Sequence, residues 1–150
     1  MVAVTDYLFL EPLIVERVKA SVPGLRGVFT APDLAAMAEQ AQITPAAHVI
    51  YIGDETGTGT GDQGTMGRSQ IVTQLWAVVI AVYYADAVDT GFGARRLAGP
   101  LIADLMRGLS GWTPENTVKA LTRGHPVQAH YANGYGYYPF VFRAQFVFNS

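Results

Sequence analysis

Residues 70–86 read QIVTQLWAVVIAVYYAD and contain the most apolar run of the chain, Leu75 to Ala85. The run is rich in valine, isoleucine and tyrosine, which favour strands, and it is too short to cross a bilayer as a helix. Its even positions carry bulky residues: Trp76, Val78, Ile80, Val82 and Tyr84. Its odd positions include the small residues Ala77, Ala81 and Ala85. Since side chains alternate between the faces of a strand, we predict a long strand. Helices are expected to pack on its small-residue face, and another apolar surface on its bulky face.

The clearest alternation occurs in residues 138–148, YPFVFRAQFVF. One face carries aromatic residues and an alanine, and the other carries a mixed set: Phe140, Phe142, Ala144, Phe146 and Phe148 against Val141, Arg143, Gln145 and Val147. This pattern predicts a strand with one core face and one face that is at least half exposed. Because Asn133-Gly134 before it is typical of a hairpin turn, we predict a hairpin whose first strand includes Val127 to Tyr131.

A long helix is predicted from about Phe92 to Leu109, because its apolar residues recur at helical spacing. They form one stripe: Leu97, Ala98, Leu101, Ile102, Leu105 and Leu109. Gly99-Pro100 lies inside this helix and predicts a kink or a break, since proline removes a backbone donor and crowds the preceding turn.

The remaining elements are predicted from shorter patterns. A helix from about Thr5 or Asp6 to Ser21 tolerates Pro12 best in its first turn. Short strands at 27–30 and 47–53 flank a brief helix at 35–40.

The predicted order is helix, strand, short helix, strand, loop, long strand, helix and hairpin. The helices are too few for a doubly wound parallel sheet. We therefore predict an α+β fold, with an antiparallel or mixed β-sheet and two main helices packed on one face. A single domain is expected over residues 1–150, because this length supports one hydrophobic core.

A glycine-rich segment, residues 53–68, reads GDETGTGTGDQGTMGR and separates two predicted strands. It is longer than most connections in a compact domain and has almost no apolar side chain. It is therefore either an arm that orders against a partner or a disordered tip without a role.

The composition indicates a protein whose surface is partly covered by partners. Half of the 150 residues are hydrophobic, only 15% are charged, and the formal net charge is -2, whereas the surface of a soluble monomer is usually richer in charge. The scattered basic residues form no patch typical of nucleic-acid or membrane binding. The chain has no cysteine, which excludes disulfides and thiolate chemistry.

No motif predicts catalysis, a cofactor or a metal. Gly59 to Gly64 matches G-x-G-x-x-G, but a strand is predicted after it rather than the helix N-terminus that would hold a pyrophosphate. The histidines lack the spacing of a zinc site: His48, His125 and His130. The carboxylate pairs 54/55 and 86/89 are ordinary residues for strand ends and turns. We therefore expect no enzyme activity.

Several segments together resemble the tail terminator, or tail completion, proteins of long-tailed bacteriophages and prophages. In chain order they are LEPLIVERVKASVPGLRGVFTAPDL (10–34), AHVIYIGDE (47–55), QLWAVVIAVYYAD (74–86), RRLAGPLIADLMRGLSGW (95–112) with Pro114, and YPFVFRAQFVF (138–148). The likeness covers nearly the whole chain. It rests on the order and character of the elements, including a first helix that ends in Val22-Pro23-Gly24 and a final aromatic strand.

The resemblance implies an α+β structural subunit of the virion neck. Such subunits would be assembled in the host cytoplasm as a hexameric ring on the head-proximal end of the tail tube. The ring would stop tube polymerisation, contact the tail tube protein and the head connector protein, and leave a passage for DNA. The scattered basic residues predict no membrane partner and no sequence-specific nucleic acid.

Five charged residues are candidate protein-interaction sites: Asp54, Glu55, Asp62, Arg68 and Arg143. The first four belong to the glycine-rich segment. If this segment lines the lumen of the ring, its carboxylates would keep passing DNA from sticking, and Arg68 would pair with an acidic neighbour. Arg143 lies on the more exposed face of the last strand.

Two other functional classes remain open. A head-tail connector or minor tail protein would have a similar build but would bind elsewhere in the virion. A small ligand-binding or enzymatic domain would use the glycine-rich segment as a lid, and nucleotides or metals would then raise its thermal stability.

Overall fold

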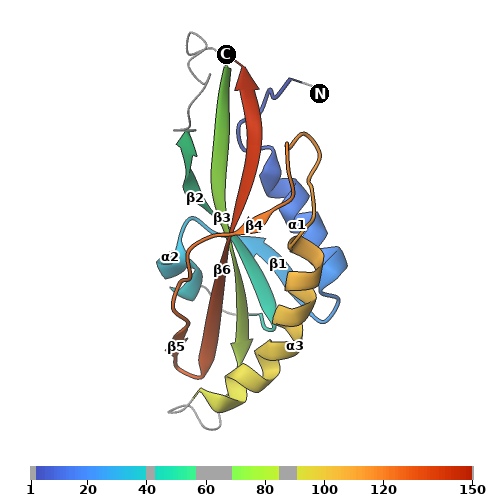
Figure 1. The fold of residues 1–150 in the computed structure, drawn as a ribbon. Coiled ribbons are helices and arrows are strands. Elements are labelled where there is room, and N and C mark those ends of the chain that lie inside the picture. The colour runs from blue at the N-terminus through green and yellow to red at the C-terminus, as the bar shows by residue number, and fades with distance from the viewer. Residues whose placement is uncertain (1–2, 40–42, 57–68, 85–90, 150) are drawn as a thin grey trace.

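The computed structural model describes residues 3–39, 43–56, 69–84 and 91–149 (Figure 1). Its six-stranded sheet has the order β1-β2-β3-β6-β4, and β5 also pairs with β6. The strands are β1 Gly27–Thr30, β2 Ala46–Thr56, β3 Ser69–Tyr83, β4 Thr122–Arg123, β5 His130–Ala132 and β6 Tyr135–Asn149. β1 runs parallel to β2, and the other strand pairs are antiparallel. The predicted α+β class with a mixed sheet is confirmed.

The two faces of the sheet bury different helices (Figure 1). Trp76, Val78 and Ile80 of β3 belong to one core cluster with side chains of α1, Leu10–Ser21, and α3, Phe92–Leu109. Ala77, Val79 and Ala81 belong to a smaller cluster on the opposite face, together with Met37 of α2, Leu34–Glu39. We call these the helix face and the α2 face.

The long helices therefore pack on the bulky face of β3, and the prediction that they pack on its small-residue face is wrong. The bulky side chains offer more apolar area to remove from water, and two long helices are needed to cover them. The alanine side of β3 receives only the short helix α2. Two main helices on one face of the sheet are nevertheless confirmed.

Most predicted elements are present, with shifted ends. α3 has the predicted bounds and runs unbroken through Pro100, and Figure 1 shows it bending along its length. α1 begins later than predicted, at Leu10, which places Pro12 in its first turn. β5 begins only at His130, so the prediction that the first strand of the hairpin includes Val127 is wrong. The hairpin turn itself is confirmed, because Asn133 and Gly134 have φ angles of 52° and 85°, as a tight hairpin turn requires.

α1 and α3 approach each other closely at Gly108. A Cβ atom placed on Gly108 would lie 2.0 Å from Oγ of Ser21. Arg17 donates a hydrogen bond from Nε to the carbonyl oxygen of Gly108 at 2.8 Å, and its guanidinium lies 5.1 Å from the centroid of the Trp112 ring. The missing side chain at position 108 thus lets α1 pack directly on the backbone of α3.

Gly108→Ala is expected to lower the free energy of unfolding by about 1–3 kcal/mol, because the added methyl group must displace Ser21 or separate the helices. Gly99→Ala is the matched control in the same helix, since no atom lies within 4 Å of a Cβ added there. This control should raise stability by roughly 0.5–1 kcal/mol. Urea denaturation measures both variants, and equal effects would contradict the close contact at Gly108.

Candidate interaction surface

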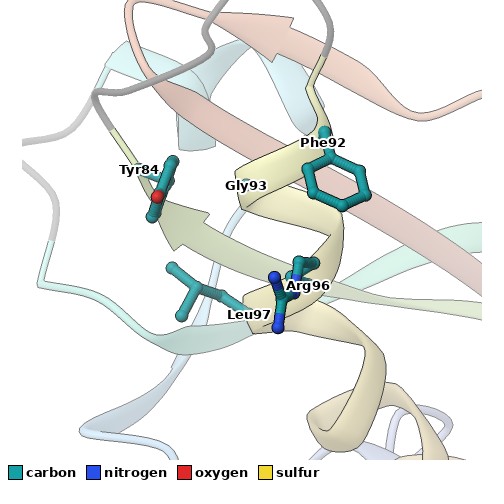
Figure 2. A pocket seen from close by; sticks show the side chains of 5 residues that line it. All are labelled: Tyr84, Phe92, Gly93, Arg96 and Leu97. Carbon is teal, nitrogen blue, oxygen red and sulfur yellow. The ribbon is translucent and has the colours of Figure 1, made fainter.

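A hollow of about 300 Å³ opens beside the first turns of α3 (Figure 2). Side chains from the end of β3 and the start of the helix line it: Tyr84, Phe92, Gly93, Arg96 and Leu97. The guanidinium of Arg96 lies 5.7 Å from the centroid of the Phe92 ring, which is within the range of a cation–π contact. Among the described residues, the lining of the hollow is therefore apolar apart from the cationic group of Arg96.

Two glycines shape this hollow. Gly91 has a φ of 68° and takes the left-handed conformation directly before α3. A Cβ atom on Gly93 would lie 2.0 Å from Cδ1 of Tyr84, so only glycine leaves room for the tyrosine ring against the first turn of the helix. The Tyr84 ring thereby forms one wall of the hollow, as Figure 2 shows.

A second hollow, of about 280 Å³, shares Leu97 with the first. Its lining comes from the segment before β2, the end of β3 and the middle of α3: Thr44, Pro45, Val82, Tyr83, Leu97, Pro100 and Leu101. Four large side chains around the two hollows are exposed, Phe92 at 55%, Tyr83 at 46%, Leu97 at 45% and Tyr84 at 37%. We call the two hollows together the α3 surface. A continuous apolar surface of this kind is typical of an interaction site.

Sequence reasoning missed the α3 surface because it assigned Leu97 to the buried stripe. In the structure, Ala98 and Leu105 are completely buried and Leu97 projects outward. Successive helical residues are about 100° apart around the axis, so the stripe is narrower than the sequence suggested. The sequence signal that could have revealed this surface is that the helix contains more leucine residues than one buried face can hold.

A second exposed apolar region lies on the α2 face, where β2 ends and β3 begins. The pairing of these strands shifts between Tyr51 and Gly53, which makes Ile52 a bulge residue. Ile52 is 52% exposed, and Ile71 near the start of β3 is 41% exposed. Bulges redirect side chains away from regular packing, and here the bulge leaves Ile52 projecting from the sheet.

Glu55 and Arg143, two of the predicted interaction residues, meet on this face. Nη1 of Arg143 lies 3.1 Å from Oε1 of Glu55. The ion pair reaches across β3, which separates the two strands that carry them. Such an exposed pair contributes only about 0.2–1 kcal/mol to stability, so its main effect is to orient both side chains. We call Ile52, Glu55, Ile71 and Arg143 the bulge surface.

Asp54 points to the helix face instead, because successive strand residues alternate. It accepts a hydrogen bond at Oδ2 from the hydroxyl of Tyr7. The Tyr7 ring packs edge to face on Phe146 and Phe148. The backbone carbonyl oxygen of Tyr7 accepts a hydrogen bond from Nε2 of Gln74 at 2.8 Å. Burial, together with the hydrogen bond to Asp54, raises the pKa of Tyr7. Asp54 thus holds the residues before α1 against the sheet.

The other two predicted interaction residues, Asp62 and Arg68, lie outside the described residues, as does most of the glycine-rich segment. The described part of that segment is the end of β2, which continues to Thr56.

Comparison with known proteins decides the family. The family model described as phage tail terminator protein matches residues 4–150. The chain belongs to the phage tail terminator family. The resemblance seen in the sequence is thereby confirmed, and family membership gives the protein a structural role in the phage tail.

The fold of this tail terminator family member also resembles that of a chain from the virion of a native gene transfer agent particle. The two share 12% identity with a TM-score of 0.51, over 88% of this chain and 90% of that chain. At this identity the likeness establishes a common fold alone. No curated protein matches the chain.

The histidines of the terminator chain lie apart in different surroundings. His48 on β2 is 2% exposed, lies 5.6 Å from the Phe29 ring between centroids, and has no hydrogen-bond partner at either ring nitrogen among the described residues. His130 stacks on Tyr137, with 6.0 Å between ring centroids. Within ranges 3–39, 43–56, 69–84 and 91–149, no group of three or more His, Cys, Asp or Glu could hold a metal ion. No helix in the described part of the chain could span a membrane.

The buried His48 predicts a loss of stability in mild acid. Burial lowers the pKa of His48 below its ordinary value of 6.5, so the folded protein keeps the ring neutral while the unfolded chain takes up a proton. The stabilising contribution is present above about pH 6.5 and declines as the pH falls towards the lowered pKa. The melting temperature should therefore fall between about pH 7.5 and about pH 5.5, and less so in His48→Phe. Parallel declines in both proteins would contradict the role of His48.

Proposed function

We propose that this chain forms a hexameric ring that caps the head-proximal end of the tail tube, stops tube polymerisation and provides the head-attachment interface. The observation that carries the proposal is the family match over residues 4–150. The partners would be further copies of the chain, the tail tube protein and the head connector protein. The location would be the virion neck, and the role is structural, without catalysis.

The distribution of apolar surface supports assembly with other proteins. The bulge surface includes Ile71, near the start of β3, and the α3 surface includes Tyr83, at the end of the same strand. Each subunit therefore exposes apolar side chains near both ends of β3, while only 15% of its residues are charged. A ring is a suitable cap because head-to-tail contacts that close upon themselves limit their own growth.

The proposed contacts include the five charged interaction residues. Glu55 and Arg143 would act from the bulge surface, where their ion pair orients them. Asp62 and Arg68 would act from the glycine-rich segment. Asp54 would act indirectly, by holding Tyr7 and the residues before α1 in place.

Deleting residues 57–67 is expected to preserve the fold and impair assembly. The deletion leaves residues 68–71 to join Thr56 to Val72, which pair in the sheet, and hairpin loops of about two to five residues are common. Forming this loop takes Ser69, Gln70 and Ile71 out of their pairing with β6, so the melting temperature should fall modestly, whereas the yield of tails with attached heads should fall strongly. A variant in which residues 57–67 are replaced by glycine and serine residues of equal number is the matched control, because it keeps the length of the segment and changes its sequence. Unfolding of the deleted protein, or normal tail assembly, would contradict the proposed role of the segment.

Immunogold labelling of intact virions tests the proposed location. Label at the junction of tail tube and head is the expected result. Label inside the head vertex after tails are removed would favour the head-tail connector alternative, and label along the shaft or at the distal tip would favour a minor tail protein. Thermal stabilisation of the purified protein by nucleotides or divalent metals would instead favour a ligand-binding or enzymatic domain.

A further inference from the structure

The α3 surface has room for an apolar side chain of a partner. Its hollows of about 300 and 280 Å³ meet at Leu97, and since a cavity of about 150 Å³ can hold a benzene molecule, either of these two hollows has room for a branched aliphatic side chain. On the bulge surface, the side chain of Ile52 is 52% exposed and lies beside a hollow of about 430 Å³, whose other lining residues are Pro32, Asp33, Ala35, Ile50 and Tyr51. Ile52 of one copy therefore fits the α3 surface of another in size and polarity.

The two surfaces also differ in charge. Arg96 contributes a guanidinium to the lining of the first hollow. Glu55 lies three residues after Ile52, and its side chain is 54% exposed even while paired with Arg143. Docking Ile52 into the hollow would bring the Glu55 carboxylate near a cation of opposite sign, and complementary charge of this kind fixes register and suppresses wrong partners.

A contact in which the α3 surface meets its own copy is unfavourable. It would place two hollows and two Arg96 side chains face to face, which leaves apolar surface unfilled and brings like charges together. A contact between unlike surfaces is head to tail, and it either closes into a ring or continues as a filament.

We propose that the bulge surface of one subunit docks into the α3 surface of the next, with Ile52 inserted beside Leu97 and Glu55 facing Arg96 of the partner subunit. The occupant of the α3 surface is thus a second copy of this chain. This inference rests on the proposed ring and identifies the surfaces that join its subunits.

Cysteine cross-linking on assembled tails tests the inference directly, because the chain has no cysteine of its own. Ile52→Cys and Leu97→Cys are introduced singly and together, and tails are purified, oxidised and separated by denaturing electrophoresis. The double variant should give a ladder of covalent oligomers that ends at the ring size. Tails that contain a mixture of the two single variants should give dimers only. Val127→Cys with Leu97→Cys is the matched control, since Val127 is 41% exposed but lies on neither surface.

The outcomes separate the inference from the proposed function. A ladder at least tenfold above the Val127 control supports docking of the two surfaces. Rings seen by native mass spectrometry or electron microscopy without that ladder would overturn the inference and leave the ring intact. Absence of any ring, in solution and on tails, would overturn both. Cross-linking of Leu97→Cys to the tail tube protein would show that the tube occupies the α3 surface and would also overturn the inference.

Discussion

Trp76→Ala is expected to lower the free energy of unfolding by about 3–5 kcal/mol. Trp76 is 1% exposed and lies in the cluster that joins β3 to α1 and α3. Its Nε1 also donates a hydrogen bond to Oε1 of Gln74 at 3.0 Å. Because Gln74 is completely buried, the lost donor would leave an unsatisfied acceptor and add about 1 kcal/mol or more to the loss. Few domains of this size can absorb such a change, since net stabilities are about 5–15 kcal/mol.

Trp112→Ala is the matched control for this substitution. Trp112 is only half-buried after the end of α3, where the Arg17 guanidinium covers its ring, so its truncation should cost less than about 2 kcal/mol. If Trp76→Ala fails to fold, Trp76→Phe keeps the measurement possible with a smaller cavity. Guanidinium denaturation followed by circular dichroism provides the values. A loss below about 1 kcal/mol for Trp76→Ala would contradict its place at the centre of the core.

Leu97→Lys is expected to leave the subunit folded and to reduce its occupancy on tails more than tenfold. Leu97 is 45% exposed and makes part of both hollows of the α3 surface, so the substitution should change stability by no more than about 0.5 kcal/mol. At a docked interface, the new ammonium group would be buried beside Arg96. Loss of a central anchor commonly costs about 2 kcal/mol or more, and each 1.4 kcal/mol is about a factor of ten in affinity.

Val118→Lys is the matched control, because Val118 is 42% exposed and lies on neither interaction surface. Both variants are expressed in place of the natural protein, and the subunit is quantified on purified tails by mass spectrometry. Normal occupancy of Leu97→Lys would show that the α3 surface is not an interface. Equal losses in both variants would indicate a general defect instead.

Periodicity predicted the elements that bury a continuous face. The bounds of α3 and the alternation in β6 are readable because burial imposes a regular spacing on apolar residues. The hairpin turn at Asn133-Gly134 is readable because only a few residues adopt its backbone angles readily. The short strand β4 pairs just two residues of its own with β6, too few for any repeating pattern.

Alternation revealed that β3 has two unlike faces but not which face the long helices cover. The long helices cover the face that offers them more apolar area to bury, and this is the face with the bulky side chains. The bulge at Ile52 shifts the pairing of β2 with β3 through a single extra residue. The local sequence indicates this bulge only through Gly53, which follows it with a φ of 152°. A one-residue shift reverses the direction of every later side chain, so the orientation of Glu55 could not be predicted.

Charge and position selected Glu55 and Arg143 as interaction residues, and this role stays a prediction. Their ion pair depends on the order β2-β3-β6 in the sheet, which the sequence does not contain. The α3 surface was missed because an exposed leucine and a buried one look alike in a helical stripe. Family membership, in contrast, was readable from the order and character of elements across the chain.

Electron microscopy of tails made without this protein tests the central claim most directly. The gene is interrupted in the parent phage or prophage, and tube lengths are measured with and without a plasmid that supplies the natural chain. A cap that stops polymerisation predicts overlong, variable tubes without heads, and a return to uniform length when the chain is supplied. Headless or headed tails of normal, uniform length in the interrupted strain would contradict the claim.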